Sequence, residues 1–275
     1  PLICRDHGGP NTGRWYSGYD EVVEHIEERT VAGSVMLCGV ECVCDKNINI
    51  RSLANKAVEF EHLLMQYNPD VVVVTETWLR PEIKDSELIP PGYAMFRKDR
   101  DTCGGGVAIV CIELIVVDDC PNTESIWCKT VFLGVPFVIG AVYRRPNAPI
   151  SFIECLQDYM CNNVPPSTRV IIAGDFNLLG IDWADLAVGS TDVAHCEALL
   201  NLSFSYDLTQ VARDNTRISP TSESILDLVL ISSNIIECSV SVEDGLSDHK
   251  LVLLSVKKAL PTKNLKPACY LYMRL

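Results

Sequence analysis

The sequence predicts a single α/β domain in which many neighbouring strands are antiparallel. Its 275 residues suit one large α/β domain or two small ones, and no repeat or internal linker divides them. Hydrophobic residues make up 48% of the chain and the mean hydropathy is +0.15, as expected for a protein with a substantial core. Short apolar runs alternate with segments of helical periodicity, which indicates a mixture of strands and helices.

The first elements precede residue 69. Helical spacing of charged and apolar residues predicts a short surface helix over residues 19–29, and apolar residues predict a strand over 35–43. Residues 46–50 are a candidate for another strand. Ser52 is a suitable N-cap for a helix with Leu53 on its apolar face, and the Asn68-Pro69 pair ends that helix.

Four consecutive valines, residues 71–74, predict a strand that is buried on both faces. The chain passes from this strand directly to Glu76, so a carboxylate stands at the strand exit. Three glycines, 104–106, then lead into a strand over 107–111. No helix and no GK[ST] sequence follows them, so we interpret the glycines as a turn that lets the backbone pass close to its neighbours, not as a phosphate-binding loop.

Residues 126–131 and 137–142 predict two antiparallel neighbouring strands, and residues 150–160 predict a helix. An unbroken apolar run over 170–173 then predicts a second strand buried on both faces, which Gly174 ends. Asp175 and Asn177 follow two residues apart. At strand spacing both side chains point the same way, so both would emerge together at the strand exit. The alternative is an Asx-type turn in which they satisfy local backbone groups.

The last third of the chain predicts a helix over 193–202 and strands over 225–231, 240–242 and 251–256. Asp227 lies on the first of these strands. The pair Asp248-His249 lies just before the last one. Polar groups therefore stand at strand ends here as well.

The formal net charge of −13 and the pI of about 4.8 argue against tight binding of nucleic acid, because phosphate affinity comes mainly from Lys and Arg. Two interpretations stay open. Either the substrate is not a nucleic acid, or DNA is bound locally, weakly and in a salt-sensitive way, with metal ions offsetting the carboxylates at the site.

Thirteen cysteines are scattered along the chain without a CxxC pair and without a histidine at zinc-site spacing. We interpret them as reduced core thiols of an intracellular protein, nuclear or cytoplasmic, and a zinc site near Cys38, Cys42 and Cys44 is the alternative. No apolar run is long enough to span a membrane and the chain starts without a signal sequence, so we expect no membrane association.

The polar residues at the strand ends suggest metal-assisted chemistry. Glu76 and Asp248 could share a hard cation such as Mg²⁺, which prefers oxygen ligands. His249 could stay cationic beside the carboxylates or act as an acid or base. Taken singly, each residue has an ordinary structural interpretation: a solvated Glu, a Ser-Asp-His turn, or a capping role for Asp227.

Seven short segments, taken in order, carry a resemblance to a known family. They are Asn49-Ile50-Arg51-Ser52-Leu53, Thr75-Glu76-Thr77-Trp78-Leu79, Gly104-Gly105-Gly106-Val107, Val142-Tyr143-Arg144-Arg145-Pro146, Gly174-Asp175-Phe176-Asn177 with Trp183, Leu226-Asp227-Leu228-Val229-Leu230, and Ser247-Asp248-His249. This set resembles the endonuclease/exonuclease/phosphatase superfamily, the deoxyribonuclease-I-like fold. Within it, the set is most similar to the apurinic-endonuclease-like domain of non-LTR retrotransposons.

The resemblance implies an α/β fold, a four-layer sandwich of two mixed, largely antiparallel β-sheets flanked by helices. It covers residues 46–256 as one endonuclease/exonuclease/phosphatase domain. Residues 1–45 are then an unassigned N-terminal extension with a candidate first strand, and residues 257–275, with five basic residues, form a C-terminal tail.

The resemblance also implies a metal site in which Glu76 binds the ion, helped by Asn49 and Asp248. The expected cofactor is Mg²⁺, with Mn²⁺ as the alternative. A metal and preplaced donors can stabilise the charge that gathers on oxygen in the transition state of phosphodiester cleavage.

Five further residues acquire catalytic roles from the same resemblance. Asp175 would orient or deprotonate the attacking water. Asn177 and His249 would hold the scissile phosphate, and Asp227 would fix the tautomer of the imidazole. Tyr143 would lie against the phosphate or the leaving oxygen.

The expected function is a metal-dependent phosphodiesterase, a hydrolase that nicks DNA as in the first step of target-primed retrotransposition. A phosphoesterase acting on a small molecule or lipid is the alternative, and an inactive retroelement fragment is a third. The expected partners are DNA and the reverse-transcriptase region of a longer polyprotein, and the expected state is a monomer.

Overall fold

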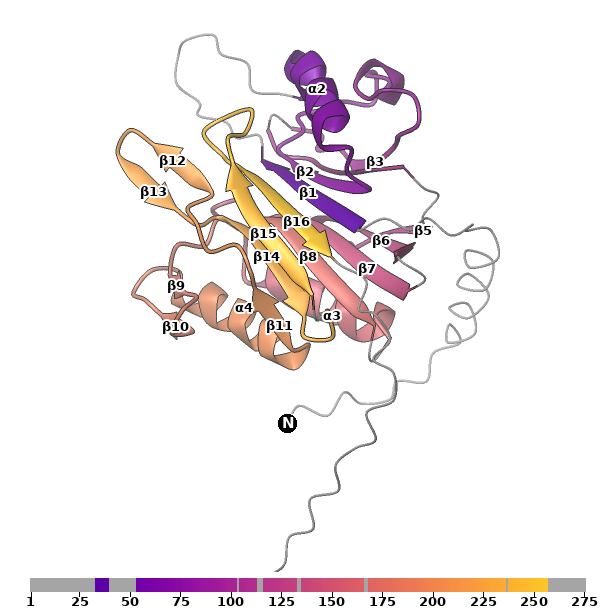
Figure 1. Ribbon diagram of the computed structural model, residues 1–275. Helices are drawn as coiled ribbons and strands as arrows, with labels where there is room; N and C mark the ends of the chain where they lie inside the picture. The colour runs from indigo at the N-terminus through magenta and orange to yellow at the C-terminus, as the bar shows by residue number, and fades with distance from the viewer. Residues whose placement is uncertain are drawn as a thin grey trace, which may run out of the picture.

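Two six-stranded β-sheets pack face to face at the centre of the computed structural model (Figure 1). The structure describes the backbone of residues 33–39 and residues 53–256, apart from residues 103 and 236 and the short segments 113–115, 133–134 and 166–167. Asn49, the helix predicted over 19–29, the strand predicted over 46–50 and the Ser52 cap all lie outside the described residues.

The first sheet contains, in spatial order, β15 (Cys238–Glu243), β16 (Leu251–Val256), β1 (Gly33–Gly39), β2 (Val71–Thr75), β4 (Val107–Cys111) and β3 (Ala94–Lys98). The second contains β11 (Leu208–Gln210), β14 (Asp227–Ser232), β8 (Arg169–Asp175), β7 (Val135–Tyr143), β6 (Glu124–Phe132) and β5 (Val116–Asp119). Only the pairs β1–β2 and β7–β8 are parallel among these described strands. The predicted mixed and largely antiparallel sheets are therefore confirmed.

Helices cover the outer face of each sheet, which makes four layers (Figure 1). They are α2 (Ala57–Tyr67) on the first sheet, and α3 (Ser151–Asn163) and α4 (Val193–Ser205) on the second. Strand β8 shows why the central strands are apolar throughout: Ile171 and Ala173 face the other sheet, whereas Val170 and Ile172 face the helices. Both faces of such a strand leave water, so no polar position alternates along it.

The helix predicted after Ser52 begins with a 3₁₀ turn, η1 (Leu53–Lys56), and continues as α2. It ends where the sequence predicts. Asn68 adopts a left-handed conformation with φ +43° and donates its N–H to the Leu64 carbonyl at 2.9 Å, and Pro69 cannot continue the helix.

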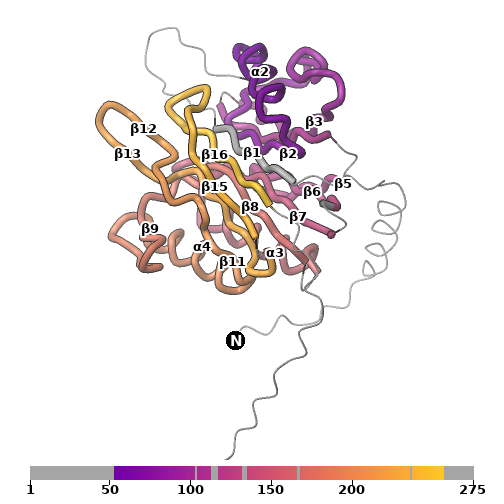
Figure 2. Tube along the Cα trace, viewed as in Figure 1, coloured from indigo at the N-terminus to yellow at the C-terminus, as the bar shows by residue number. Residues whose placement is uncertain are grey.

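The elements that the sequence pattern missed are short and lie at edges. Strands β3 and β5 end their sheets, and charged residues interrupt their apolar positions. The other missed elements are a 3₁₀ turn and four strands of two or three residues, which are too short to show a period: η2 (Asp85–Glu87), β9 (Ile181–Asp182), β10 (Ala187–Val188), β12 (Arg217–Ser219) and β13 (Ser222–Ser224). The hairpin β12–β13 projects from the body of the molecule (Figures 1 and 2).

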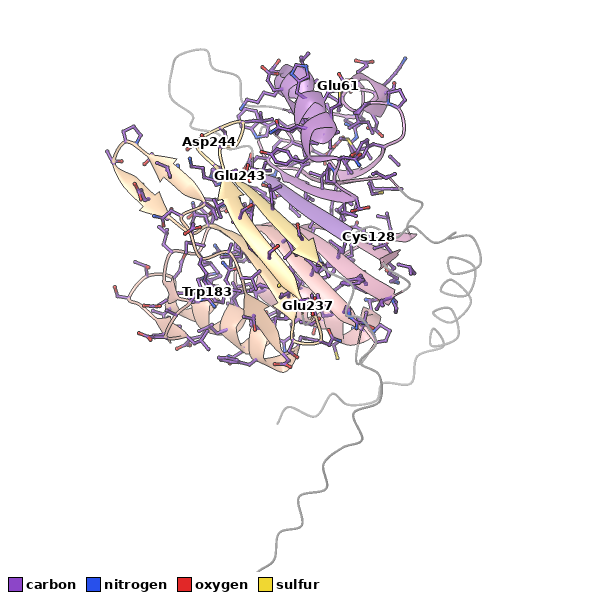
Figure 3. All side chains as sticks on the ribbon, in the orientation of Figure 1. Glu61, Cys128, Trp183, Glu237, Glu243 and Asp244 are labelled. Carbon is purple, nitrogen blue, oxygen red and sulfur yellow. The ribbon has the colours of Figure 1, made fainter. Side chains whose placement is uncertain are left out.

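The described cysteines agree only in part with the interpretation as core thiols. Of the seven whose side chains the structure describes, four are buried, two are half-buried and Cys161 is exposed, and none forms a disulfide. Cys128 lies fully buried on β6 in the second sheet (Figure 3). Burial raises the pKa of the Cys128 thiol, so it is a poor nucleophile and a poor metal ligand. Of the helices in the described part of the chain, none combines the length and apolar character needed to cross a membrane.

Candidate active site

The exit of β8 places Asp175 in the interior, where only 1% of its surface is exposed. Asn177 turns back onto it. The Asn177 backbone N–H donates to Asp175 Oδ1 at 2.9 Å, and the Asn177 amide Nδ2 donates to Oδ2 at 2.9 Å. Asn177 has φ +49°, so the strand does not continue through it. The Asx-type turn and the paired polar side chains, which the sequence offered as alternatives, are thus the same structure.

The two hydrogens of the Asn177 amide are both used. One reaches Asp175 and the other reaches the carbonyl of Arg144 at 2.9 Å. Since an amide nitrogen has only two hydrogens, Asn177 here offers Oδ1 alone to a further partner. In this arrangement its first task is to hold the Asp175 carboxylate.

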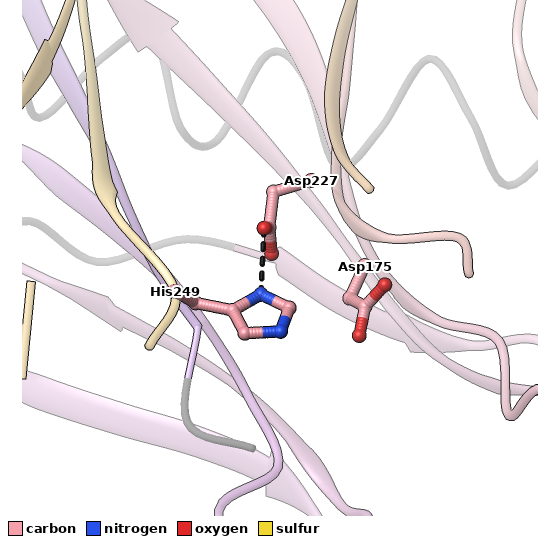
Figure 4. A group of neighbouring side chains, drawn as sticks. All are labelled: Asp175, Asp227 and His249. Atoms are coloured by element: carbon pink, nitrogen blue, oxygen red, sulfur yellow. Dashed lines mark hydrogen bonds and ion pairs between the residues drawn. The ribbon is translucent and has the colours of Figure 1, made fainter. Parts of the chain in front are cut away.

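Asp227 lies directly opposite Asp175, because β14 and β8 pair in antiparallel register at these two residues. Its Oδ2 lies 2.7 Å from Nδ1 of His249, whose side chain is 1% exposed. A carboxylate only accepts, so Nδ1 carries the hydrogen of this contact. Figure 4 shows Asp227, His249 and Asp175 together, and one candidate ligand atom of each lies within 4.8 Å of the others.

Thr216 supports this group from behind. Its buried hydroxyl accepts the backbone N–H groups of Leu226 at 3.0 Å and Asp227 at 2.9 Å. Its carbonyl accepts the N–H of Lys250 at 2.6 Å, next to His249. One threonine therefore ties the start of β14 to the segment that carries the histidine.

The exit of β2 places Glu76 in the interior with 5% of its surface exposed. Glu76 Oε2 accepts the backbone N–H of Gly105 at 2.7 Å and the indole Nε1–H of Trp78. Glu76 and Trp78 both adopt left-handed backbone conformations, with φ +54° and +53°. Such conformations in non-glycine residues cost energy and gather at functional sites.

The three glycines form the turn that carries one of these donors. Their φ values are +76°, +75° and +86° for Gly104, Gly105 and Gly106. A Cβ on Gly105 would lie 2.3 Å from the guanidinium carbon of Arg100, and one on Gly106 would lie 2.5 Å from the Thr77 hydroxyl. The predicted turn with close backbone approach is therefore confirmed, and side chains at these two positions would displace their neighbours.

Tyr143 connects the two strand exits. It pairs with Asp175 in the parallel register of β7 and β8, and it is buried. Burial, then the charge of Glu76 and a hydrogen bond with it, and then the charge of Asp175 raise the pKa of the Tyr143 phenol. The phenol therefore stays protonated and can donate. The Arg100 guanidinium lies 5.6 Å from the centre of its ring.

Of the residues predicted to bind the metal, Glu76 directly follows β2 and Asp248 lies just before β16. Asp248 Oδ2 accepts from Arg217 Nε at 3.4 Å, and its side chain is 17% exposed. Among the described residues, the group with metal-ligand spacing is Asp175, Asp227 and His249. Carboxylates supply most of the ligands in either set, and that chemistry fits a hard divalent cation.

Several supporting residues carried no signal in the sequence. Glu124 accepts the Gly106 N–H at 3.0 Å and forms an ion pair with Arg100. These residues, like Thr216, come from segments far from the residues they support. Trp78 follows Glu76 closely in the chain, but only the left-handed backbone turns its indole back onto the carboxylate.

Comparison with known proteins agrees with this fold. Residues 137–253 match the model of a family described as endonuclease-reverse transcriptase. A search of curated protein sequences finds no match.

Solved structures with the same fold include three from nucleic-acid enzymes. The endonuclease domain of TRAS1, a telomere-specific non-LTR retrotransposon, has 14% identity and a TM-score of 0.61 over 82% of this chain and 99% of that one. The 3′ phosphatase NExo from Neisseria, bound to a product DNA hairpin, has 17% identity and a TM-score of 0.61 over 82% and 100%. An AP endonuclease from Archaeoglobus fulgidus has 14% identity and a TM-score of 0.60 over 82% and 99%.

These structural likenesses establish the fold, and the family match covers strands and helices of the second sheet together with the segment that carries Asp175, Asp227 and His249. The chain therefore has the deoxyribonuclease-I-like fold, and its residues 137–253 are similar to the endonuclease-reverse transcriptase family.

Proposed function

We propose that the protein is a metal-dependent endonuclease that nicks DNA, as in target-primed retrotransposition. The observation that carries the proposal is the buried Asp227–His249 pair, with a 2.7 Å hydrogen bond, beside the buried carboxylate of Asp175. Buried acids need partners, and here the partners arrange a histidine and a second carboxylate for proton transfer at one point.

Asp175 acts as the group that orients or deprotonates the attacking water. Its Oδ1 accepts the backbone N–H of Asn177 and its Oδ2 accepts the Asn177 amide, which sets the carboxylate plane. Asp227 holds His249 with Nε2 turned toward the site, where it contacts the phosphate. The neutral phenol of Tyr143 donates to the phosphate or the leaving oxygen.

The divalent cation, Mg²⁺ or Mn²⁺, would be held by Glu76 with Asp248 and with Asn49, which lies outside the described residues. When bound, it supplies positive charge that stabilises the oxygens of the transferring phosphoryl group. Glu76 is suited to this task because Gly105 and Trp78 both donate to its Oε2 and so fix the orientation of the carboxylate.

The likeness to the TRAS1 endonuclease domain and the match to the endonuclease-reverse transcriptase family support DNA as the substrate. They also support a setting inside the cell, beside the reverse-transcriptase region of a longer polyprotein. The protein would act there as a monomer that binds DNA weakly and in a salt-sensitive way.

A phosphoesterase acting on a small molecule or lipid is the second candidate. The net charge of −13 favours it, because a strongly acidic protein repels the phosphates of a long polyanion.

A nicking assay tests the proposal. Supercoiled plasmid is incubated with the protein in Mg²⁺ and in EDTA, beside a chromogenic phosphodiester, and Asp175→Asn serves as the control for contaminating nuclease. We expect open-circular plasmid only with Mg²⁺ and only with the unmodified site. Cleavage of the small substrate with intact plasmid would support the second candidate instead, and no cleavage of either would refute the enzymatic proposal.

A further inference from the structure

Arg144 is the most deeply buried charged side chain beside the site. Its relative exposure is 0%, although it follows Tyr143 directly at the end of β7. Its Nη1 donates to two carbonyls, those of Phe176 and Asn177, each at 3.2 Å. The residue therefore reaches the turn that follows Asp175.

The backbone of Arg144 contacts the same turn twice more. Its N–H donates to the Asp175 carbonyl at 2.8 Å, and its own carbonyl accepts the Asn177 amide at 2.9 Å. Four hydrogen bonds thus join one residue to three consecutive residues that contain the proposed base and the side chain that holds it.

Few groups around this guanidinium compensate for the cost of burying its charge. Its nearest carboxylate oxygen belongs to Asp192, at 4.0 Å, on a side chain that is 46% exposed. The Nε and Nη2 groups have no hydrogen-bond partner among the described residues. Burial lowers the pKa of Arg144, so the environment disfavours its charge. A buried cation with unpaired donors costs stability that an apolar side chain of similar size would not.

The geometry of the turn supplies the missing reason. Asn177 holds a left-handed backbone, which persists only where surrounding contacts enforce it. We infer that Arg144 is the positioning residue that keeps the Asp175–Asn177 turn in its productive shape, by holding the two carbonyls on either side of the Asn177 backbone. The inference rests on the proposed function, since it assigns Arg144 an effect on the same reaction through Asn177.

Arg144→Met tests this with a side chain of similar length that is apolar and well suited to burial. We expect kcat to fall about 10- to 100-fold, the usual effect of removing a group that orients a reacting one. The KM for DNA should change less than about threefold, because Arg144 is buried and does not meet the substrate. The matched control is Arg145→Met, which removes the same charge from the next residue, whose side chain is exposed, and should leave kcat unchanged.

A double-mutant cycle with Asn177→Ala separates positioning from general structural support. If Arg144 acts through Asn177, Arg144→Met should cost little further rate in the Asn177→Ala background. Arg144→Lys, which keeps a charged donor, should recover part of the rate. If Arg144→Met does not stay folded, Arg144→Gln replaces it in the cycle. Losses that multiply fully, or a folded Arg144→Met with wild-type kcat, would overturn the inference.

The proposed function can fail separately. If the wild-type protein cleaves no phosphodiester, the inference is tested on the turn itself by the NMR signal of the Asn177 side-chain amide. Arg144→Met should shift that signal and Arg145→Met should not. An unshifted signal in Arg144→Met would overturn the positioning role.

Discussion

The exits of β2 and β8 present the same local design with different supports. Each strand is buried on both faces and places a carboxylate in the interior. Non-glycine residues with positive φ lie at both exits: Glu76 and Trp78 after β2, and Asn177 after β8. Asp175 is held by Asn177, two residues away along the chain. Glu76 is held by Gly105, 29 residues away, as well as by its near neighbour Trp78.

The two exits therefore depend on different remote segments. The Asp175 carboxylate is held by Asn177, two residues away, and Arg144 supports that turn from the end of β7. The position of Glu76 depends on a glycine turn in another part of the sheet, which in turn depends on Glu124 and Arg100. Damage to the glycine turn should therefore impair the Glu76 exit, whereas loss of the Arg144 contacts should impair the Asp175 exit.

The largest effect is expected from Asp175→Asn. The amide keeps the shape of the side chain but removes the base, and loss of a positioned general base costs about 10² to 10⁴ in rate. DNA should still bind, because β8 is untouched, and the melting temperature should fall only slightly, because the new amide has one acceptor oxygen for the two Asn177 donors. Nicking rate and melting temperature measured on the same preparation decide the matter; an active variant that melts early would leave Asp175 with a turn role only.

Glu76→Gln should weaken Mg²⁺ binding by at least about 10-fold, a change on the scale of other metal-site substitutions. A glutamine carbonyl can still accept from Gly105 and Trp78, so the fold should persist. The measurement is the rate of nicking as Mg²⁺ is titrated. Unchanged metal dependence would remove Glu76 from the metal site and favour the group of Asp175, Asp227 and His249.

Gly105→Ala, compared with Gly104→Ala, sharpens the claim that Glu76 has a remote support. Both substitutions place an alanine at positive φ, which should lower the unfolding free energy by about 1 to 2 kcal/mol. Only the Cβ on Gly105 would overlap Arg100, whereas the one on Gly104 has no neighbour closer than 3.8 Å. We expect the Gly105 variant alone to need several-fold more Mg²⁺. Equal Mg²⁺ requirements, measured beside urea unfolding curves, would mean that the donor from Gly105 is unimportant.

The smallest effect is expected from Tyr143→Phe, as a change in how the unfolding free energy depends on pH. Tyr143 interacts with the carboxylates at both exits. Its pKa lies above the ordinary value of 10.0 in the folded protein. Below pH 10 the phenol is protonated in both the folded and unfolded chains, so its contribution is fully present. Above pH 10 only the unfolded chain loses the proton, so the unfolding free energy falls, by up to about 1.4 kcal/mol per pH unit. Tyr143→Phe should flatten that decline between pH 10 and 11; identical slopes would show that the phenol is not protected.

Central elements were predictable because their burial is complete. Four valines in β2 and the apolar run of β8 have no other stable location than the middle of a covered sheet. The edge strand β3 was not predictable, since Arg97 and Lys98 remain partly exposed on it and break the apolar pattern. The order of strands in each sheet likewise depends on pairing between distant segments.

At the site, local sequence patterns identify the carboxylates that leave buried strands and the amide that follows Asp175, because strand burial and Asx-type turns are properties of neighbouring residues. The pairing of distant segments brings Asp227 opposite Asp175 on the adjacent strand, places His249 against Asp227, and lets Gly105 hold Glu76. These contacts join residues 22 to 52 positions apart or bridge separate strands, and a hydrogen bond of that range leaves no periodic trace in the chain. Arg144 is the clearest case. The sequence contains two adjacent arginines that look equivalent, and the fold buries Arg144 beside the Asp175–Asn177 turn.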